Sequence, residues 1–582
     1  MAEFYHWDLS KIYANDEEIN KAVEEVNKDL DKLEELKKDV KVNLYEILEL
    51  QTEIFRNAEK LYSYSSMKRD ENSKIAKYQK LAIEIEALVN LVETKFSFLS
   101  PCILNFNEKD WEELKKDKRY DFYKLYFDRI LRVKQHMLSE EMEYILASYQ
   151  EVAGASHTSY YMLTNADMKF PELENTDEKL SQATFVKFLS GKNRALREEA
   201  FEKFYQVYRD HENTISSTLF GSMKGVITEA KLRKYSSARQ MALFADDVNE
   251  KVYDSLIESA HKALPALYDY FGLKKKVLEL DEYHMYDIYA NISDYDRKIP
   301  FEEAKEIVLN ALKPMGEDYL SIIKKAFDEN WIDVYPGEGK RSGAYSGGCY
   351  DSSPYILMNY NDNLSSVFTL IHELGHSVHS YLSRGNNDYI YHNYTIFVAE
   401  VASTTNEMLL INYLLNNSKS KEEKIYLLNY YADMFKSTVF RQTMFAEFEK
   451  ITHEKLEEGE ALTASDFNKI YHDLNKLYFG DNVVSDADIA LEWARIPHFY
   501  RDFYVYKYAT GLSAAAVLSR RILNKEENAL EDYFTFLKDG NNHFPIVQLQ
   551  RAGADMADPK TVDKGLEGFK EKVEELKKVL AE

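Results

Sequence analysis

Two histidines and a glutamate stand at the spacing H-E-x-x-H in residues 372–376: His372, Glu373 and His376. In a helix, side chains four residues apart share one face and lie roughly 6 Å apart along the axis. Both imidazoles can therefore bind one tetrahedral zinc ion. The glutamate between them can act as the base that takes a proton from water. The motif predicts a zinc hydrolase site.

A catalytic zinc site needs a third protein ligand and keeps one position open. The metzincin pattern is excluded because it requires glycine and histidine where the chain has His379 and Leu382. A second predicted helix, beginning near Thr395, offers Glu400 and Glu407. These two lie roughly 10 Å apart along the axis, so one zinc ion cannot bind both directly. One should be the ligand and the other should orient a ligating histidine, and the spacing leaves both assignments open.

A histidine and four tyrosines follow within eleven residues of one another: His498, Tyr500, Tyr504, Tyr506 and Tyr508. Tyr504 and Tyr508 are four residues apart and would share a helical face. Attack on a peptide carbonyl puts negative charge on its oxygen, which such donors can stabilise. Aromatic core packing is the other interpretation, and the residue pattern alone gives the two equal weight.

Residues 340–360 interrupt the helical pattern just before the metal motif. Two short extended runs flank a turn at Ser353-Pro354, which predicts a small β element. Glycines allow another backbone to approach closely, and an exposed strand edge can pair with an extended peptide. An ordinary loop is the alternative interpretation. We predict instead that this run binds the substrate. The residues concerned are Gly343, Ala344, Tyr345, Ser346 and Gly347.

The elements that carry these residues are predicted to be helices. The metal-motif helix should begin near Asn363 and end near Gly385-Asn386, with His379 in a packing or supporting role. Only 10 prolines and 20 glycines occur in 582 residues, which favours long helices. A linker is predicted at 100–109. The expected domains are an N-terminal helical bundle (1–110), a second helical segment (111–200) and a catalytic domain (201–582).

The composition limits the partners and the compartment. A net charge of −25 argues against nucleic acid or an anionic membrane surface as a partner. No uninterrupted apolar stretch approaches 18 residues and no secretory signal is recognised, so we expect no membrane span. Two cysteines cannot form a disulfide framework, which fits a reducing, cytoplasmic location. The oligomeric state is not predicted.

Five segments together resemble the oligoendopeptidase F family, which is related to thimet oligopeptidase. They are residues 7–13, 372–380, 396–407, 496–511 and 552–559. The resemblance covers nearly the whole chain. It implies a mainly α, two-lobed metallopeptidase fold of the zincin type, with a deep substrate channel.

The resemblance also implies roles for individual residues. Glu400 would be the third zinc ligand and Glu407 would support a ligating histidine. Three further residues would face the scissile bond: His498, Tyr504 and Tyr508. The resemblance does not indicate which of the two tyrosines contacts the oxyanion. One zinc ion per chain and oligopeptide substrates are expected.

The leading hypothesis is a zinc metalloendopeptidase that hydrolyses internal bonds of short peptides, with Glu373 as the base. A zinc peptidyl dipeptidase or carboxypeptidase on a similar helical fold is the alternative enzyme. A helical peptide-binding scaffold with a degenerate metal site is the alternative from another class, but no ligand or base is missing from the motif.

Overall fold

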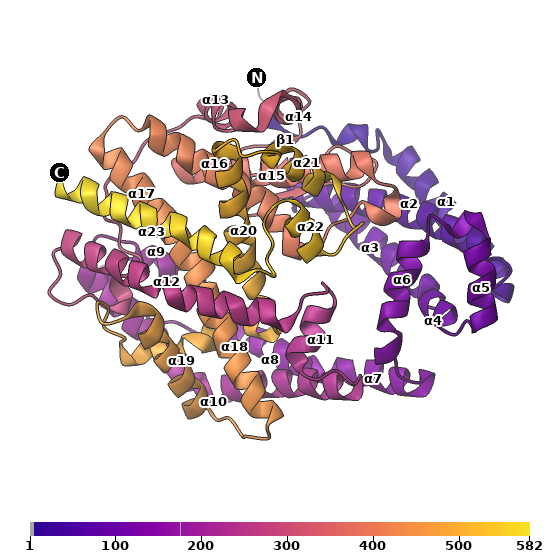
Figure 1. Ribbon diagram of the computed structural model, residues 1–582, viewed down its shortest axis with the longest axis horizontal. Coiled ribbons are helices and arrows are strands. Elements are labelled where there is room, and N and C mark those ends of the chain that lie inside the picture. Colours follow the sequence, from indigo (N-terminus) through magenta and orange to yellow (C-terminus); the bar gives the residue numbers. More distant parts are fainter. Residues whose placement is uncertain (1–4, 175) are drawn as a thin grey trace. The chain divides into compact units, whose positions relative to one another are not determined.

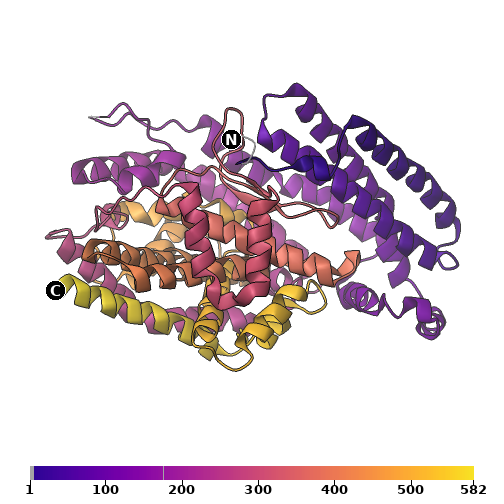
Figure 2. The same ribbon diagram turned by 90° about the horizontal axis from the view of Figure 1, so that it is seen from above.

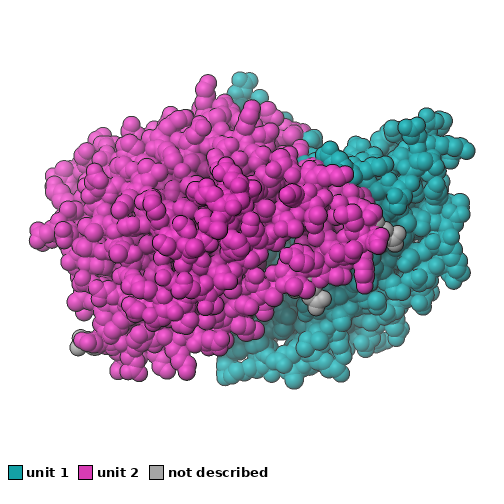
Figure 3. Space-filling model, turned by 90° about the horizontal axis from the view of Figure 1, so that it is seen from below, with its two compact units in different colours: residues 1–135, 296–410, 521–544 teal, residues 136–295, 411–520, 545–582 magenta. Residues whose placement is uncertain are grey.

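The computed structural model describes residues 5–174 and 176–582 and is built almost entirely of helices, as predicted (Figure 1). The chain folds into two compact units, each assembled from three separate segments (Figure 3). Unit 1 comprises residues 1–135, 296–410 and 521–544, and unit 2 comprises residues 136–295, 411–520 and 545–582. The division into three contiguous domains stays a prediction.

Among the described residues, ten α-helices lie wholly in unit 1, and two more have residues in both units. Unit 1 holds α1 Asp16–Leu36, α2 Leu44–Glu71, α3 Ala76–Phe96, α4 Leu99–Leu104, α5 Glu108–Lys116, α6 Lys124–Val133, α13 Phe301–Ala311, α14 Gly316–Asp328, α15 Leu364–Asn386 and α21 Ala529–Lys538. Two helices, α16 Ile396–Asn417 and α20 Tyr506–Leu523, have residues in both units.

Unit 2 contains the remaining helices. They are α7 Glu140–Ala153, α8 Ala155–Met162, α9 Gln182–Leu189, α10 Arg194–Leu232, α11 Ala238–Phe244, α12 Glu250–Val277, α17 Lys421–Phe435, α18 Arg441–Glu457, α19 Ala464–Phe479, α22 Pro545–Arg551 and α23 Pro559–Ala581.

Helices α1, α2 and α3 lie side by side in unit 1 (Figure 2). Val26, Leu30 and Leu33 of α1 recur at spacings of three and four and are buried, so the apolar stripe faces the bundle. Residues 76–104 are long and apolar enough to cross a membrane by length and composition alone. Such a test is weak evidence here, because the stretch is divided between α3 and α4, and side chains such as Val92 form part of the unit 1 core.

The predicted linker at 100–109 is wrong. Pro101 lies in the first turn of α4, where its missing N–H removes no helical hydrogen bond. A new helix, α5, begins at Glu108 after a capping box formed by Asn107 and Asp110. Only residues 105–107 therefore remain between the two helices.

A three-stranded sheet precedes α15, as predicted for this part of the chain. Its strands are β1 Ile332–Asp333, β2 Tyr345–Gly347 and β3 Tyr355–Leu357, in the order β1-β3-β2. The strand β2 pairs antiparallel with β3, with Ser346 opposite Ile356, and β1 pairs parallel with β3. Strand β1 was not predicted, because two residues are too few for a readable alternation. The order leaves β2 at an edge of the sheet.

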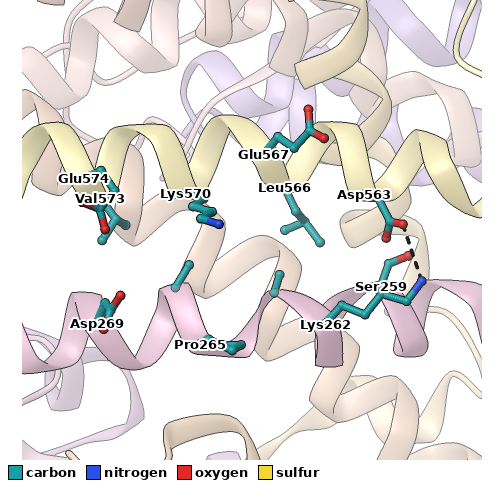
Figure 4. A pocket seen from close by; sticks show the side chains of 12 residues that line it. Ser259, Lys262, Pro265, Asp269, Asp563, Leu566, Glu567, Lys570, Val573 and Glu574 are labelled. Atoms are coloured by element: carbon teal, nitrogen blue, oxygen red, sulfur yellow. Dashed lines mark hydrogen bonds and ion pairs between the residues drawn. The ribbon is translucent and has the colours of Figure 1, made fainter.

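In unit 2, α12 and α23 lie side by side over much of their length and enclose a groove of about 450 Å³ (Figure 4). Lys262 and Asp563 form an ion pair of 3.5 Å across it. The remaining charged lining residues carry both signs and include no histidine or cysteine. The groove therefore offers acidic and basic groups but not the ligands of the predicted zinc site.

Candidate metal centre and aromatic cluster

Helix α15 begins and ends where the sequence predicts and brings the two motif histidines together. Asn363 caps it by accepting a hydrogen bond from the Ser366 N–H at 2.9 Å. His372 and His376 lie one turn apart, with ring centroids 4.8 Å apart and Nε2 atoms 3.2 Å apart. Both are on the side of α15 that faces α16.

Close contact between α15 and α16 places Glu400 beside these rings. Its Oε2 lies 3.4 Å from His372 Nε2 and 3.7 Å from His376 Nε2. Gly375 permits the approach, since a Cβ there would lie 2.9 Å from the Ala402 carbonyl oxygen. The structure thus assembles three ligand-type atoms from α15 and α16, all three on residues of unit 1.

The three atoms have the dimensions of a zinc site. Their separations of 3.2, 3.4 and 3.7 Å compare with about 3.3 Å between ligands of a tetrahedral ion bound at about 2.0–2.1 Å. In the described part of the chain, His372, His376 and Glu400 form the group of metal-ligating residues that converge in this way. Two histidines and one glutamate are a donor set of catalytic zinc enzymes, so these residues fit the metal.

Glu407 lies on the other side of the first histidine. His372 Nδ1 is hydrogen-bonded to Glu407 Oε1, whereas its Nε2 faces Glu400. A carboxylate bonded to Nδ1 fixes the tautomer and directs the Nε2 lone pair toward a metal. The distances thus distinguish the two glutamates that spacing alone left equivalent.

Burial and mutual contact shift the pKa values of all three side chains. Burial opposes the charged forms, but hydrogen bonds to Glu400 and Glu407 raise the pKa of His372 to about 10. Burial and the adjacent His372 lower the pKa of His376 to about 4. Burial also opposes ionisation of Glu400, yet the two histidines lower the pKa of its carboxyl to about 2. A divalent cation would compete with protons for these ligand atoms, so its binding should depend on pH.

Glu373, the base that the motif predicts, lies in an environment that perturbs its carboxyl. Its side chain is buried, with 7% of the residue exposed. Burial is the main cause that raises its pKa to about 7, with Glu400 adding to the effect, while His372 and the Ser346 N–H act in the opposite direction. A carboxyl with this pKa can accept and release a proton near neutral pH.

The predicted substrate run occupies β2 and the turn before it. Gly343 adopts φ +83° in open space, and Gly347 has the Tyr345 ring close to where a side chain would be. Ser346 Oγ lies 2.8 Å from Ser377 Oγ of α15, which ties the strand to the metal-motif helix. Among the described strands β2 pairs only with β3, so its other edge is the one that an extended peptide could use.

His498, Tyr504 and Tyr508, here called the aromatic cluster, are brought together in unit 2. Ring centroids are 6.2 Å apart for His498 and Tyr504, 6.0 Å for His498 and Tyr508, and 5.4 Å for the two tyrosines. The predicted helical face is wrong: Tyr504 precedes α20, which begins at Tyr506. A turn through Phe503, at φ +57°, brings the rings together instead.

The neighbouring aromatic residues have other partners. Tyr500 stacks on Tyr160 with centroids 4.3 Å apart, and its hydroxyl lies 2.7 Å from Thr218 Oγ1. Tyr506 is fully buried against Tyr253. His379 stacks on Tyr394 at 3.6 Å, which agrees with the packing role expected for it. Within the cluster, burial and two nearby arginines lower the pKa of His498.

Asn406, which was not predicted from the sequence, holds the two metal-site helices together. Its side chain is fully buried, donates to the Ile371 carbonyl at 3.2 Å and accepts from the Tyr319 hydroxyl at 2.8 Å. The available signal was weak, because Asn406 follows three other polar residues, Ser403, Thr404 and Thr405, between the two glutamates. A buried amide must find partners, and here it finds them next to a ligand.

The fold and the three converging side chains define a mainly α-helical protein with a candidate metal centre. Two family models match the chain, that for peptidase family M3 over residues 187–568 and that for oligopeptidase F over residues 103–170. Oligopeptidase PepF of Bacillus subtilis is 43% identical over 99% of this chain and 87% of its own length. Group B oligopeptidase PepB of Streptococcus agalactiae is 38% identical over 100% and 98%.

The crystal structure of oligoendopeptidase-F from Enterococcus faecium superimposes with a TM-score of 0.75 at 35% identity, over 97% of this chain and 99% of that one. The chain therefore belongs to peptidase family M3. Membership makes it an enzyme of the metalloendopeptidase class that acts on oligopeptides, as the sequence analysis predicted. The oligoendopeptidase F resemblance and the mainly α fold are likewise confirmed.

Proposed function

We propose that this protein is a zinc-dependent endopeptidase that cleaves internal bonds of short peptides, with one zinc ion per chain. His372, His376 and Glu400 would hold the ion and Glu407 would orient His372. The observation that supports the proposal best is the triangle of ligand atoms, whose sides of 3.2, 3.4 and 3.7 Å suit a tetrahedral ion.

When bound, zinc supplies Lewis-acid activation of water and of the peptide carbonyl near neutral pH. Glu373 takes a proton from the attacking water and passes it to the leaving amine. Its pKa of about 7 suits both transfers. The burial that raises this pKa also removes competing solvent from the carboxyl.

The remaining predicted residues bind and orient the peptide. Residues 343–347 offer the free edge of β2 to an extended substrate, and Ser346 ties that edge to α15. The aromatic cluster supplies donors to the developing oxyanion, with Tyr504 and Tyr508 as the two candidates. This role rests on the family resemblance and on the mutual contact of the three rings.

Cleavage of a ten-residue peptide blocked at both ends tests the proposal. The zinc-loaded protein should give two internal fragments by mass spectrometry, and a chelator should abolish them until zinc is restored. Failure to cut the blocked peptide, with cleavage of an unblocked one, would favour a peptidyl dipeptidase or carboxypeptidase. A folded protein unable to hold stoichiometric zinc would favour a scaffold.

The physiological metal and the compartment are part of the same proposal. The ligand types also accept manganese or cobalt, so restoration with each ion in turn tests the assignment to zinc.

We propose a cytoplasmic location, in keeping with two cysteines that are both free. Cell fractionation tests this, and activity found mainly outside the cytoplasm would contradict it.

A further inference from the structure

The turn that carries Tyr504 is in an unfavourable conformation and needs support. Residues 501–505, here called the tyrosine turn, connect the short helix η12 Pro497–Tyr500 to α20. Phe503 at its centre adopts φ +57°, a left-handed conformation that a bulky side chain rarely adopts. Such a conformation persists only where the surrounding structure fixes it.

Helix α18 supplies that support from two positions one turn apart. Glu449 Oε1 accepts a hydrogen bond from the Phe503 N–H at 2.9 Å. His453 Nε2 lies 2.8 Å from Asp502 Oδ1, and the His453 ring packs on the Phe503 ring with centroids 4.5 Å apart. Two consecutive residues of the turn are thus held by an i, i+4 pair on one helical face.

A second contact orients the His453 ring. His453 Nδ1 lies 2.8 Å from the Glu449 carbonyl oxygen. The other ring nitrogen faces Asp502, and both side chains of this pair are buried, with 2% and 8% exposed. The ring is therefore held between the backbone of α18 and the tyrosine turn.

The carboxyl of Glu449 is buried next to this pair. Glu449 is 2% exposed, and burial raises its pKa well above the usual range, with Asp502 adding to the effect and the Phe503 N–H opposing it. A carboxyl offers an acceptor oxygen to an N–H group whether or not it is protonated. The support under the turn thus combines the contact of His453 with Asp502 and one carboxyl acceptor.

We propose that Glu449 and His453 are positioning residues that hold the tyrosine turn and so fix Tyr504 in the aromatic cluster. The proposal rests on the proposed function only in assigning that cluster to the substrate. Neither residue needs to touch the peptide. Their effect passes through the turn backbone to the tyrosine, where a displacement of about 1 Å can cost about 10²-fold in rate.

A matched pair of substitutions at one position tests the proposal. Glu449→Leu removes the acceptor for the Phe503 N–H, and kcat of the zinc-loaded enzyme on the blocked peptide should fall about 10²-fold, with a smaller change in KM. Glu449→Gln keeps a carbonyl oxygen in place and should keep kcat close to wild type. An unchanged kcat for the leucine variant, or equal damage by both, would overturn the proposal.

Glu447 provides a control on the same helix. Its carboxylate accepts from the Tyr478 hydroxyl at 2.9 Å and lies 2.8 Å from His261 Nε2, but no contact with the tyrosine turn is found for it. Glu447→Leu should lower the melting temperature and leave kcat unchanged. A loss of kcat equal to that of Glu449→Leu would show a general effect of damaging α18 and would overturn the proposal.

The most specific test is a double-mutant comparison of Glu449 and Tyr504. If Glu449 acts through Tyr504, then Glu449→Leu should cost much less in a Tyr504→Phe background than alone, since the two changes remove the same interaction. Fully additive losses would overturn the proposal.

A structural measurement tests the positioning role of Glu449 and His453 independently of the proposed endopeptidase function. Amide hydrogen exchange in a peptide covering 501–505 should become faster in Glu449→Leu and in His453→Leu, but not in Glu449→Gln or Glu447→Leu. Exchange unchanged in the two turn variants would overturn the positioning role. An inactive wild-type holoenzyme would instead overturn the proposed function. The exchange rates of residues 501–505 would still test the positioning role, because they do not depend on activity.

Discussion

Gly375 of α15 lies directly against Ser403 of α16: a Cβ at position 375 would stand 2.6 Å from the Ser403 Cα. Real Cβ atoms do not approach backbone so closely, so a side chain here must push the helices apart. The contact lies between His372 and His376 on one helix and beside Glu400 on the other. Helix spacing and ligand spacing are therefore set by the same residue.

Gly375→Ala should therefore damage both the fold and the metal site. Overpacking typically costs about 1–3 kcal/mol, and displaced ligands should lower zinc affinity as well. Thermal unfolding and zinc content after dialysis measure the two effects. Gly385→Ala is the control, because no atom lies within 4 Å of a Cβ built there in the same helix; it should be neutral or up to about 1 kcal/mol more stable. Normal zinc content in Gly375→Ala would contradict the prediction.

The two glutamates of α16 should differ in their effect on metal binding. Glu400→Ala removes a ligand and should abolish stoichiometric zinc. Glu407→Ala removes only the partner of His372 Nδ1, and about a 10- to 100-fold loss of affinity is expected. Competition with a chromogenic chelator measures both. The reverse order of the two losses would show that the ligand is Glu407.

Glu373→Gln separates proton transfer from metal binding. The amide matches the carboxylate in size but cannot take a proton, so kcat should fall by at least the ~10²- to 10⁴-fold supplied by a general base. Zinc content should stay at one per chain, because Glu373 is not among the three converging ligands. Peptide cleavage and elemental analysis on the same sample provide the check. An active glutamine variant would end the proposed mechanism.

Much of the geometry of the candidate metal centre could be predicted from the sequence, because helical geometry is local. The spacing of His372 and His376 fixes their common face, and the ends of α15 follow from Asn363 and the residues near Gly385. The choice between Glu400 and Glu407 could not be made from spacing. It depends on how two helices pack, and Gly375 and Asn406 control that packing through contacts distant in sequence.

The aromatic cluster shows a different limit. The i, i+4 spacing of Tyr504 and Tyr508 suggested one helical face, but the chain turns at Phe503 and the helix begins later. A phenylalanine at positive φ has no sequence signature, since its conformation is imposed by Glu449 and His453 from another helix. The rings nevertheless meet, because the turn achieves the contact that the helix was expected to provide.

A buried lysine should make the stability of the protein depend on pH above neutrality. Lys274 is fully buried, and its Nζ donates to the Ile288 carbonyl at 2.9 Å. Burial lowers its pKa from 10.5 to about 8, against the attraction of Asp433. Between these two values the unfolded chain keeps a proton that the folded chain has lost, so the free energy of unfolding rises with pH in that window.

The comparison with Lys274→Met isolates this contribution. The stability of the wild type relative to the variant should improve by about 3 kcal/mol between pH 8 and 10.5, and should be constant below pH 8. Asp433 keeps Lys436 as a partner at 2.5 Å in the variant. Melting temperatures at pH 7 and pH 10 measure the change, and exposed Lys276→Met serves as the control. A difference that does not vary with pH would contradict the prediction.

Removal of single hydroxyl groups should identify the tyrosine that acts on the substrate. Tyr504→Phe and Tyr508→Phe each keep the ring contacts of the aromatic cluster and remove one donor. The variant that has lost the oxyanion donor should show kcat lower by about 10²- to 10³-fold with KM little changed. The other should show a smaller effect.

Tyr500→Phe is the matched control for these variants. Its hydroxyl contacts Thr218 and its ring stacks on Tyr160, away from the three rings of the cluster. Loss of that hydrogen bond should lower the melting temperature slightly, in line with about 0.5–1.5 kcal/mol for one neutral hydrogen bond, and leave kcat unchanged. If all three variants kept full activity, the tyrosines would be packing residues and the oxyanion would need another donor. A loss confined to Tyr500→Phe would move that role out of the aromatic cluster altogether.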